Sequence, residues 1–581
     1  MYTVGHTSER LSSAPAPTFL ERLSWVDKLP LTLISGVLLG LSSSGFGIWW
    51  LAWFALAPLV ILVFGSRGKV EAMLTGLLFG LAYNLASLRW LFEVYPLRWF
   101  GLDNFVGMVA AGQLWFIESL HQSLLLSLLA LFIYLLPLRS GYLPDYKRPF
   151  WPLLLSIPLM YVFMQWVIAP AEFFLGLPIN QLAYSQSRVP ELIQVARLGG
   201  SMTIDFLLVM ANCAIASLII ELTGIARPPA TRTDPLSPKI GAVMDLLIVF
   251  GIVGICAAWG QSEIMRAGIM TPYYSPPAKG QADSSDAKTD DSTDAKPVEL
   301  TPEQKANFAP PITVAVVQGN LQVDTRSTIT ADSLAERFSQ LASKLGASII
   351  VVPEATVGGA GLSPLPVRAV FEQIAVSEKK EVVLGSIEAV KDGRINAVRL
   401  IGPETGKNRL YIKQRLVPFT EFIPLGPLGS VIPSNLKAKL THTTGGFVEG
   451  NSVSIMDSSF GKIGASVGSE IVYQDAIAAE VSKGASLLVN VSDTSYFHNS
   501  TLSQQLLSAA ILRAVENGRY LILASNTGVS AVIDPYGIVT SASLQGQKGI
   551  LVDRVQFLHR KTPFTRAWWM WTPFYNVIRN R

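Results

Sequence analysis

Three short segments in the second half of the chain place polar side chains directly after apolar runs. Glu354 follows the first run, where partial burial raises a carboxyl pKa toward the working pH and suits a general base. A glutamate in this position is also common at an exposed strand end. Lys413 lies in an apolar and aromatic stretch, 411–424, which suits an ammonium aimed at a developing oxyanion. The third segment, 464–473, is typical of a strand that ends in a small-residue turn at Gly468.

The elements around these segments predict an α/β domain. From residue 312, short β-rich runs alternate with helix-like segments. The β-rich runs cover 312–317, 348–352, 381–384, 486–491, 520–524 and 529–533, and the helix-like segments cover 331–345, 366–377 and 501–517. The domain spans 312–558, about 250 residues, which is enough for one sizeable core. In such folds sites collect just past buried strands, as these polar residues do.

The first half of the chain has the composition of a membrane protein. Hydrophobic residues make up 50% of the 581 residues and charged residues only 15%, against about 25% in an ordinary soluble domain. The mean hydropathy is +0.38, which excludes a wholly soluble protein. Apolar runs near the length of a membrane helix cover 31–66, 72–88, 105–138, 150–171, 198–220 and 240–259.

These runs predict seven membrane spans. The first run carries no charge, and the turn at 42–47 divides it into two spans. The run 105–138 is too long for one straight crossing, so we expect a span at 120–138 and a partner segment at 105–117 in or on the interface.

Basic residues in alternate short loops predict the orientation, because cytoplasmic loops are enriched in Lys and Arg. They are Arg10, Arg22 and Lys28 before the first span, Arg67 and Lys69 after the second, Arg139, Lys147 and Arg148 after the fourth, and Arg227, Arg232 and Lys239 after the sixth. Seven crossings that start inside leave the second half in the periplasm or outside the cell. We therefore expect a cytoplasmic N-terminus at 1–29 and a membrane domain at 30–260.

Two further segments differ in composition from their neighbours. Residues 261–311 include a run rich in Asp, Ser, Thr and Lys, which cannot bury enough apolar surface to fold and predicts a flexible tether. The basic, aromatic tail at 559–581 holds Trp568, Trp569 and Trp571. Aromatic residues beside cations suit a headgroup interface, and packing on the α/β domain is the alternative.

Several functions are excluded or disfavoured. The net charge of +4 is small and the basic residues are scattered, so we expect no nucleic-acid partner. The two cysteines, Cys213 and Cys256, lie in apolar runs and provide neither a disulfide framework nor a metal site. His442 and His498 are isolated from other metal ligands, so we predict no metal and no cofactor.

Glu118 and His121 lie three residues apart in an apolar run, hence on one helical face. Ionisable residues within a membrane are functional candidates by default. Our division of the run places this pair near the end of a span, where a wet interface explains it equally well.

In order and spacing, Glu354, Lys413 and the turn at Gly468 resemble the Glu-Lys-Cys triad of the carbon-nitrogen hydrolase (nitrilase) superfamily. With a seven-span membrane half before it, the whole chain resembles the bacterial apolipoprotein N-acyltransferase family. Further segments typical of that family are 177–178, 182–186, 198–200, 314–320, 413–424, 513–519 and 526–530.

The resemblance implies an αββα sandwich fold in the periplasm and a multi-pass anchor in the bacterial inner membrane. It also implies that an acyl chain passes from a membrane phospholipid, through a cysteine thioester, to the N-terminal amine of a lipid-modified lipoprotein. Carried over to this sequence, it makes Glu354 the proton acceptor and Lys413 the oxyanion stabiliser. Glu421 and Glu470 become the two supporting glutamates.

The nucleophile is the main departure from the family pattern. Where the family has Cys-Tyr-Glu, this chain has Gly468-Ser469-Glu470, and a glycine cannot be acylated. Tyr496 and His498 also replace a tryptophan and a glycine of the pattern, and the sequence predicts no eighth span of the kind that usually ends the family.

Three possibilities remain open for a chain without the cysteine. Ser469 could replace it, although a shift of one residue usually turns a side chain to the other face of a strand. Acyl transfer could be direct, with Glu354 deprotonating the amine and Lys413 stabilising the intermediate. The domain could also be inactive and retained for binding lipid or partner proteins. Against inactivity, all four charged residues of the site remain. A soluble amidase is a more distant alternative, because it would leave the membrane half without a purpose.

Overall fold

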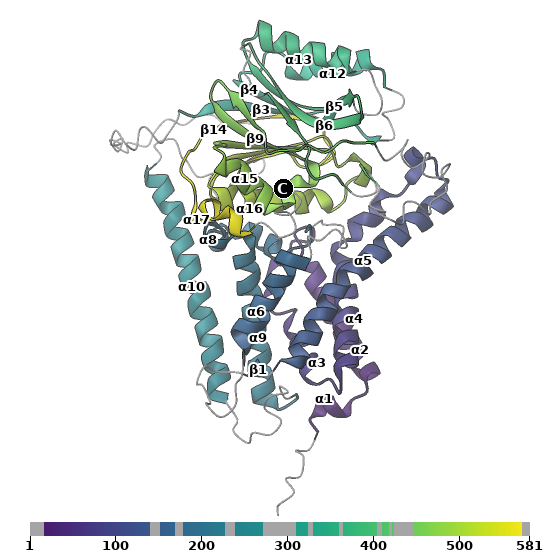
Figure 1. The fold of residues 1–581 in the computed structure, drawn as a ribbon, viewed down its shortest axis with the longest axis vertical. Helices are drawn as coiled ribbons and strands as arrows, with labels where there is room; N and C mark the ends of the chain where they lie inside the picture. The colour runs from purple at the N-terminus through teal and green to yellow at the C-terminus, as the bar shows by residue number, and fades with distance from the viewer. Residues whose placement is uncertain are drawn as a thin grey trace, which may run out of the picture.

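The computed structural model describes residues 17–136, 138–139, 151–168, 178–226, 239–270, 310–323, 329–358, 364–403, 409–417, 421–422 and 446–571. A helical bundle forms one half of the molecule, and a layered α/β unit stands on one end of it (Figure 1). The tether at 271–309, His442 and the last ten residues of the tail lie outside the described residues.

Apolar helices of different lengths build the bundle. They are α1 (Phe19–Arg22), α2 (Trp25–Leu41), η1 (Trp49–Trp53), α3 (Ala57–Phe64), α4 (Lys69–Ser87), α5 (Asn104–Leu135), α6 (Leu153–Phe163), α9 (Ser201–Thr223) and α10 (Lys239–Met270). In the described part of the chain, four helices are long and apolar enough to cross a membrane: α4, α5, α9 and Gly241–Ala267 of α10. Shorter apolar helices run over Trp49–Phe64 and Leu153–Trp166. Seven spans therefore remain a prediction.

The division of run 105–138 into two segments is wrong. Helix α5 is continuous over 32 residues. It has no proline, and both of its halves are attached to the neighbouring α4: Trp115 Nε1 donates to the Leu85 carbonyl and Ser127 Oγ to the Met73 carbonyl. Glu118 and His121 consequently lie in the middle of a helix rather than near its end. Helix α10 also continues to Met270, so residues 261–270, which we assigned to the tether, are helical.

Short elements connect the bundle helices with each other and with the α/β half. They are η2 (Arg89–Val94), η3 (Leu97–Phe100), β1 (Leu138–Arg139), β2 (Trp151–Pro152), η4 (Met164–Ile168), η6 (Leu182–Arg188), α7 (Pro190–Ile193) and α8 (Ala196–Gly199).

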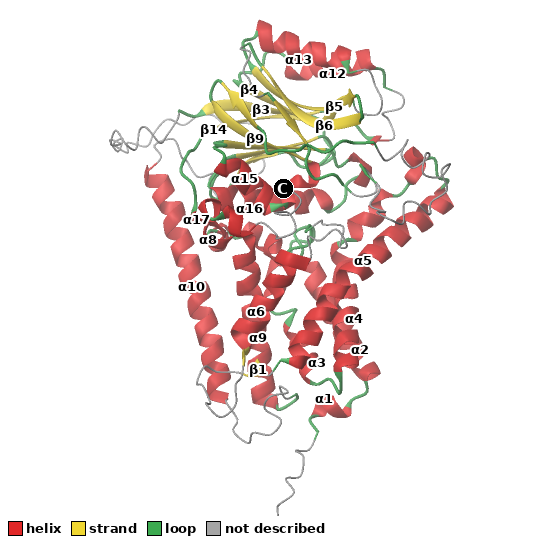
Figure 2. Cartoon of the chain, viewed as in Figure 1, coloured by secondary structure: helices red, strands yellow, loops and turns green. Residues whose placement is uncertain are grey.

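The α/β half contains two six-stranded sheets packed face to face, with helices on both outer sides (Figure 2). One sheet has the order β14-β3-β4-β5-β6-β7 and the other β13-β12-β11-β10-β9-β8. The first sheet comprises β14 (Gly549–Val555), β3 (Ile312–Gln318), β4 (Ile349–Val357), β5 (Glu381–Val390), β6 (Gly393–Ile401) and β7 (Leu410–Ile412). The second comprises β13 (Val539–Ala542), β12 (Ala531–Ile533), β11 (Leu521–Ser525), β10 (Leu487–Ser492), β9 (Gly461–Val467) and β8 (Ile455–Ser458).

Two helix layers cover the sheets. The first sheet packs beneath α12 (Ala331–Ala342) and α13 (Leu365–Ser377), and the second lies on α15 (Gln474–Ser482) and α16 (Leu502–Asn517). Between the sheets, the core is built of β-branched residues from both, including Val316, Val351, Val489 and Ile522. The predicted fold class, a polytopic helical membrane domain followed by an αββα sandwich, is confirmed.

Helix α16 connects the two halves. Its Glu516 accepts a hydrogen bond from the Ser201 amide at the start of α9 at 2.7 Å, and its Ser508 bonds Ser187 at 2.9 Å. One hydrophobic core runs without interruption from the bundle helices to α15 and α16. The attachment fixes the α/β unit on the bundle, so residues from both halves can form one site.

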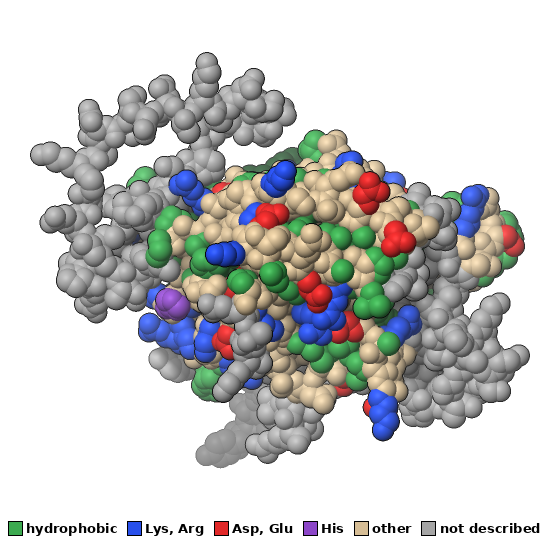
Figure 3. Space-filling model, turned by 90° about the horizontal axis from the view of Figure 1, so that it is seen from above, with side chains coloured by type: hydrophobic (Ala, Val, Ile, Leu, Met, Phe, Trp, Pro, Cys, Tyr) green, Lys and Arg blue, Asp and Glu red, His purple; other side chains and the backbone are tan. Residues whose placement is uncertain are grey.

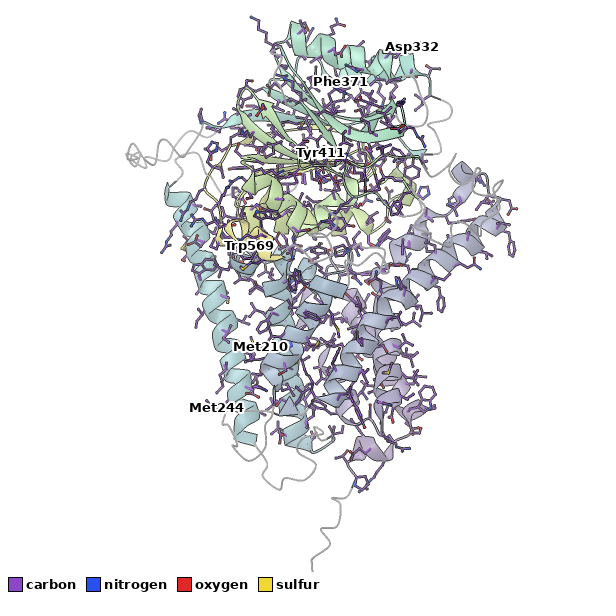
Figure 4. All side chains as sticks on the ribbon, viewed as in Figure 1. Met210, Met244, Asp332, Phe371, Tyr411 and Trp569 are labelled. Carbon is purple, nitrogen blue, oxygen red and sulfur yellow. The ribbon has the colours of Figure 1, made fainter. Side chains whose placement is uncertain are left out.

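The face of the α/β half away from the bundle carries scattered basic and acidic side chains with hydrophobic ones between them (Figure 3). At the opposite end of this half, α17 (Pro563–Arg566) and η13 (Trp568–Trp571) begin the tail. Both pack against α15, while Trp569 remains 66% exposed near the junction of the halves (Figure 4).

Candidate active site

The site residues come from the ends of neighbouring strands in both sheets. Glu354 lies in β4, where the pairing with β5 is interrupted between Val352 and Val357. At this irregularity the backbone of Glu354 does not follow the regular pairing of the two strands. Lys413 follows β7 directly, and Gly468 follows β9. The structure thus brings the three predicted segments together at one edge of the sandwich.

A single lysine holds two carboxylates. Lys413, only 2% exposed, places its Nζ 2.9 Å from Glu421 Oε2 and 3.0 Å from Oε1. The same Nζ lies 3.9 Å from Glu354 Oε1. This arrangement leaves one buried cation beside two potential acids.

Asn396 in β6 bridges the same two carboxylates. Its Nδ2 donates to Glu354 Oε1 at 2.7 Å and to Glu421 Oε1 at 2.9 Å. Backbone amides bond the outer oxygens: Asp493 N donates to Glu354 Oε2 at 2.9 Å and Val417 N to Glu421 Oε2 at 2.8 Å. Every carboxylate oxygen of the pair therefore has a donor, which fixes both side chains before any substrate binds.

Glu470 plays a different part from Glu421. Its carboxylate accepts hydrogen bonds from the amides of Gln414, Arg415 and Val467 and from Tyr411 Oη, at 2.7–3.0 Å. None of these bonds involves Lys413 Nζ. Glu470 therefore fastens the segment that carries Lys413 to the turn that carries Gly468. Tyr411, whose hydroxyl completes this attachment, lies deep inside the sandwich (Figure 4).

Gly468 lies inside the site. A Cβ built on it would be 3.1 Å from Glu354 Oε2 and 3.6 Å from Lys413 Nζ. Its φ of +57° is in the left-handed region, which favours glycine. A side-chain atom at position 468 would thus contact both Glu354 and Lys413, but glycine has no side chain.

Ser469 is half-buried in the one-turn helix η11 (Gly468–Val472). No hydrogen bond in the described part of the chain joins its hydroxyl to Glu354 or Lys413. The geometry therefore offers no activated serine nucleophile.

The surroundings of the site raise the pKa of both Glu354 and Lys413, but for different reasons. Burial raises the pKa of Glu354 to about 7, and the nearby Lys413 ammonium only partly opposes this shift. Burial works against the charge on Lys413, but the carboxylates of Glu421, Glu354 and Glu470 outweigh it and raise the lysine pKa. A carboxyl with a pKa near neutrality beside a permanently charged ammonium suits general acid–base chemistry on a developing oxyanion.

Sequence reasoning missed Asn396 and Tyr411. Asn396 is a buried amide between Ile395 and Ala397 in the middle of β6. A polar residue in an otherwise apolar strand was the available signal, because a buried amide needs partners. The strand β6 itself was also missed.

His498, which stands where the family pattern has glycine, adopts φ 48° and ψ −139°. This backbone region belongs almost only to glycine. Of the two cysteines, Cys213 is buried in α9 and Cys256 lies in α10, so neither approaches the site. Among the described residues, no group of three His, Cys, Asp or Glu side chains could hold a metal ion.

An apolar cavity of about 170 Å³ in the bundle adjoins the site. Its walls come mainly from α4, α5, η2 and the segment around Ile179, and two residues of the α/β half, Val417 and Phe497, close it. Val417 is the residue whose amide bonds Glu421, and Phe497 packs edge-on against Trp90 of the cavity wall with ring centres 5.2 Å apart. Val417 therefore contacts both the cavity and the charged site.

The fold and the site define a nitrilase-type sandwich with a buried carboxylate–lysine centre, attached to a bundle of apolar helices. Residues 313–559 match the carbon-nitrogen hydrolase family, and residues 35–214 match the apolipoprotein N-acyltransferase N-terminal domain. The chain belongs to the apolipoprotein N-acyltransferase family and is a membrane protein.

Individual relatives agree over most of the chain. An apolipoprotein N-acyltransferase of Geobacter metallireducens is 27% identical over 90% of this chain and 89% of its own length. Another, from Gloeobacter violaceus, is 24% identical over 92% of this chain and 89% of its own. Among solved structures, Saccharomyces cerevisiae Nit3, a nitrilase-superfamily member, covers 46% of this chain and 96% of its own at 15% identity and a TM-score of 0.33.

Proposed function

We propose that this protein transfers an acyl chain from a membrane phospholipid to the N-terminal amine of a diacylated lipoprotein, and that it does so without a covalent acyl-enzyme. The observation that carries the proposal is the position that a Cβ would take at Gly468, which lies 3.1 Å from Glu354 Oε2 and 3.6 Å from Lys413 Nζ. The amine nitrogen of the acceptor can occupy this space and meet the base and the cation together.

The reaction then needs no thiol. Glu354 takes a proton from the lipoprotein α-ammonium, and the freed nitrogen attacks the carbonyl carbon of the phospholipid ester. Lys413 stabilises the negative charge on the carbonyl oxygen in the tetrahedral intermediate. Collapse breaks the ester C–O bond, and protonated Glu354 gives its proton to the departing glycerol oxygen. The regenerated Glu354 carboxylate then takes the second proton from the nitrogen, which leaves a neutral amide, and passes that proton to solvent. The products are an amide on the lipoprotein and a lysophospholipid.

The adjoining cavity supports a lipid donor. Its lining is mostly apolar, and it ends at Val417, whose amide bonds Glu421 beside Lys413. An acyl chain in the cavity would bring its ester to the charged site, and holding both reactants there supplies the proximity that a covalent step would otherwise give.

The same proposal includes the setting of the enzyme. The basic loops favour a cytoplasmic N-terminus, a membrane domain at residues 30–260 and a periplasmic α/β half in a bacterial inner membrane. In that setting the site faces the leaflet in which lipoproteins are anchored by their lipid.

A second candidate is an inactive family member that binds lipid or partner proteins. Gly468 favours it, because the side chain that the family acylates is absent. The complete hydrogen bonding of Glu354, Lys413 and Glu421 favours the enzyme, since a binding protein has no need of a carboxyl whose pKa is raised to about 7.

Mass spectrometry of a diacylated lipopeptide incubated with phospholipid vesicles and the purified full chain separates the two candidates. An enzyme adds the mass of one acyl chain to the peptide, Glu354→Gln abolishes this gain, and Ser469→Ala leaves it unchanged. Glu372→Gln, which alters an exposed surface pair with Arg368, is the matched control. No gain under conditions in which a cysteine-bearing relative is active would support the binding candidate.

A further inference from the structure

Basic side chains gather where the tail packs against the end of the bundle. Arg197 lies in α8, Arg519 follows α16, and Arg560, Lys561 and Arg566 belong to the tail, the last of them in α17. We call these five residues the basic cluster. Helix α8 packs against both α16 and α17, and it lies beside α17 in Figure 1. The cluster thus joins segments that are far apart in the sequence.

Hydrogen bonds and close contacts hold these segments together. Arg519, whose side chain is 1% exposed, donates from Nη1 to the Arg560 carbonyl at 2.7 Å. Gly518 adjoins both Arg197 and Thr562: a Cβ built on it would be 3.5 Å from Arg197 Nη2 and 3.1 Å from Thr562 Cγ2. Thr562 caps α17, the helix that carries the last member of the cluster. The basic cluster is therefore one region of the surface around Gly518 and Thr562.

The basic cluster has no counter-charge among the described residues. The hydrogen bonds of Arg519 go to backbone carbonyls, and Lys561 Nζ donates to the Ser482 carbonyl at 2.6 Å. Arg197 Nη1 is buried without a hydrogen-bond partner, and Arg560 and Arg566 are exposed. Within the described ranges, none of the five forms an ion pair with a carboxylate.

The acidic residues around the cluster have other partners. Glu516 pairs with Arg513 at 2.7 Å, and Glu263 pairs with Arg266 at 3.2 Å. Asp534 accepts backbone amides of its own turn.

The positive charges also act on one another. Burial, and to a lesser extent the neighbouring Arg197, lower the pKa of Arg519 to about 10. Cations held together in this way repel each other, so an anion bound among them is stabilising.

The position of the cluster is that of a membrane surface. Helix α8 is followed directly by α9, which is long and apolar enough to cross a membrane. Apolar side chains next to the cluster in the chain are exposed: Leu198 at 50%, Trp569 at 66% and Met570 at 45%. Trp569 lies near the junction of the two halves (Figure 4). Tryptophan beside cations at the end of a membrane helix is typical of the headgroup region, whereas a soluble anion has no use for the exposed apolar side chains.

We propose that the basic cluster binds the headgroup of an anionic phospholipid, while Leu198, Trp569 and Met570 contact the apolar part of the same leaflet. A net negative headgroup supplies the charge that the cluster lacks. A zwitterionic headgroup would add a cation to a region that already has five. The inference goes beyond the proposed function, because a lipid bound here keeps its acyl chains and fastens the tail and the α/β half to the membrane surface.

Competition between two lipids tests the inference on the full chain. The protein is equilibrated with vesicles of equal parts phosphatidylglycerol and phosphatidylcholine that carry the same acyl chains, with no lipopeptide present. Native mass spectrometry then gives the ratio of the two lipids that stay bound. The variants are Arg197→Gln, Trp569→Ser and the double variant Arg560→Gln with Arg566→Gln.

Arg89→Gln is the matched control. Arg89 is 63% exposed and pairs with Glu93, and it lies at the same end of the bundle, since the carbonyl of Ser87 accepts a hydrogen bond from Gln505 of α16. It therefore removes one positive charge at a similar depth but outside the cluster.

We expect the unmodified chain to favour phosphatidylglycerol. Each arginine removed from the cluster should lower the ratio about five-fold, which corresponds to about 1 kcal/mol for a basic residue near a membrane surface. Trp569→Ser should weaken the binding of both lipids and leave their ratio unchanged, because an interfacial tryptophan does not distinguish headgroup charge. Arg89→Gln should keep the ratio of the unmodified chain.

Two outcomes overturn the inference. One is an unchanged ratio in the double variant, whose side chains are both exposed, so that this variant decides the test if Arg197→Gln does not fold. The other is an equal fall in Arg89→Gln, which would assign the preference to the charge of the whole surface.

A second arm separates a lipid from a soluble anion. Excess inorganic phosphate is added at constant ionic strength, with chloride in the reference sample. Phosphatidylglycerol should stay bound, because its acyl chains and the exposed apolar side chains contribute to its binding. Its displacement by phosphate would show that the cluster is a site for a soluble anion and would contradict the proposal.

Discussion

Glu354 and Glu421 in the α/β half share one lysine and one asparagine, and each accepts a hydrogen bond from a backbone amide of its own, whereas Glu118 in the bundle is held by the next turn of its own helix. In the first group every carboxylate oxygen has a donor without a ligand, and the partners come from strands and loops of both sheets. The second has no Lys or Arg partner among the described residues, and His121 Nδ1 lies 3.4 Å from its carboxylate. A complete group is preorganised to act on a reacting centre, while an incomplete one gains stability when a ligand completes it.

The largest effect should come from removing the base. Glu354→Gln keeps the shape of the site and its bond from Asp493 N, but it cannot accept the amine proton. We expect a loss of transfer rate of about 10²–10⁴-fold, the usual contribution of a positioned base. The ratio of anionic to zwitterionic lipid bound in native mass spectrometry should stay unchanged. A variant that loses both would show that the charged site and the basic cluster are not separate sites.

Removing the shared cation should affect stability as well as rate. Lys413→Met leaves Glu354 and Glu421 buried side by side without a positive charge. Breaking a buried pair in this way costs about 3–5 kcal/mol, measured by chemical denaturation in detergent against the unmodified chain. Glu118→Gln removes a carboxylate that no described Lys or Arg pairs with, and it should lower stability far less than Lys413→Met does. Equal destabilisation by both variants would contradict the contrast between the regions.

The pH dependence of transfer should report Glu354. Because burial raises its pKa to about 7, the base is progressively protonated below that pH, and the rate should fall about ten-fold per pH unit there. The pH below which the rate falls should change in Glu354→Asp. If titration of the acceptor amine caused the fall instead, this pH would be the same in both chains. The same raised pKa makes folding less favourable as pH rises from 4.5 through 7, since the folded state then has to hold the charge.

The smallest effect concerns the loop beside the site. His498 has φ 48° and ψ −139°, so His498→Gly should raise the free energy of unfolding by about 1 kcal/mol. Denaturation of the two chains under the same conditions measures it. A loss of stability would mean that contacts of the imidazole outweigh the backbone strain.

Much of the charged site was predictable because polar residues follow apolar runs typical of strands and because their order resembles the triad of a known family. Glu354, Lys413 and Gly468 were placed together on that basis, and the structure brings them within contact distance. Asn396 was not found, since it lies inside a strand and its role depends on pairing between β5 and β6 and on the release of Glu354 from β4. Sequence order alone does not give those relations.

The bundle was less predictable. Apolar runs indicate where helices lie, but the cavity is made by side chains of helices that are distant in sequence. Glu118 and His121 were correctly placed on one helical face and wrongly placed near the end of a span. The error arose because a run longer than the bilayer was divided, whereas α5 remains continuous by packing along α4.

The most direct test of transfer without a covalent intermediate is the intact mass of the protein during turnover. The full chain is mixed with phospholipid and diacylated lipopeptide, quenched at successive times and weighed, with Gly468→Cys as a lane in which a thioester can form. We predict that the lipopeptide gains one acyl chain while the unmodified protein keeps its mass and Gly468→Cys acquires an acyl adduct. An acyl adduct on the unmodified protein, or no lipopeptide product from it, would contradict the account.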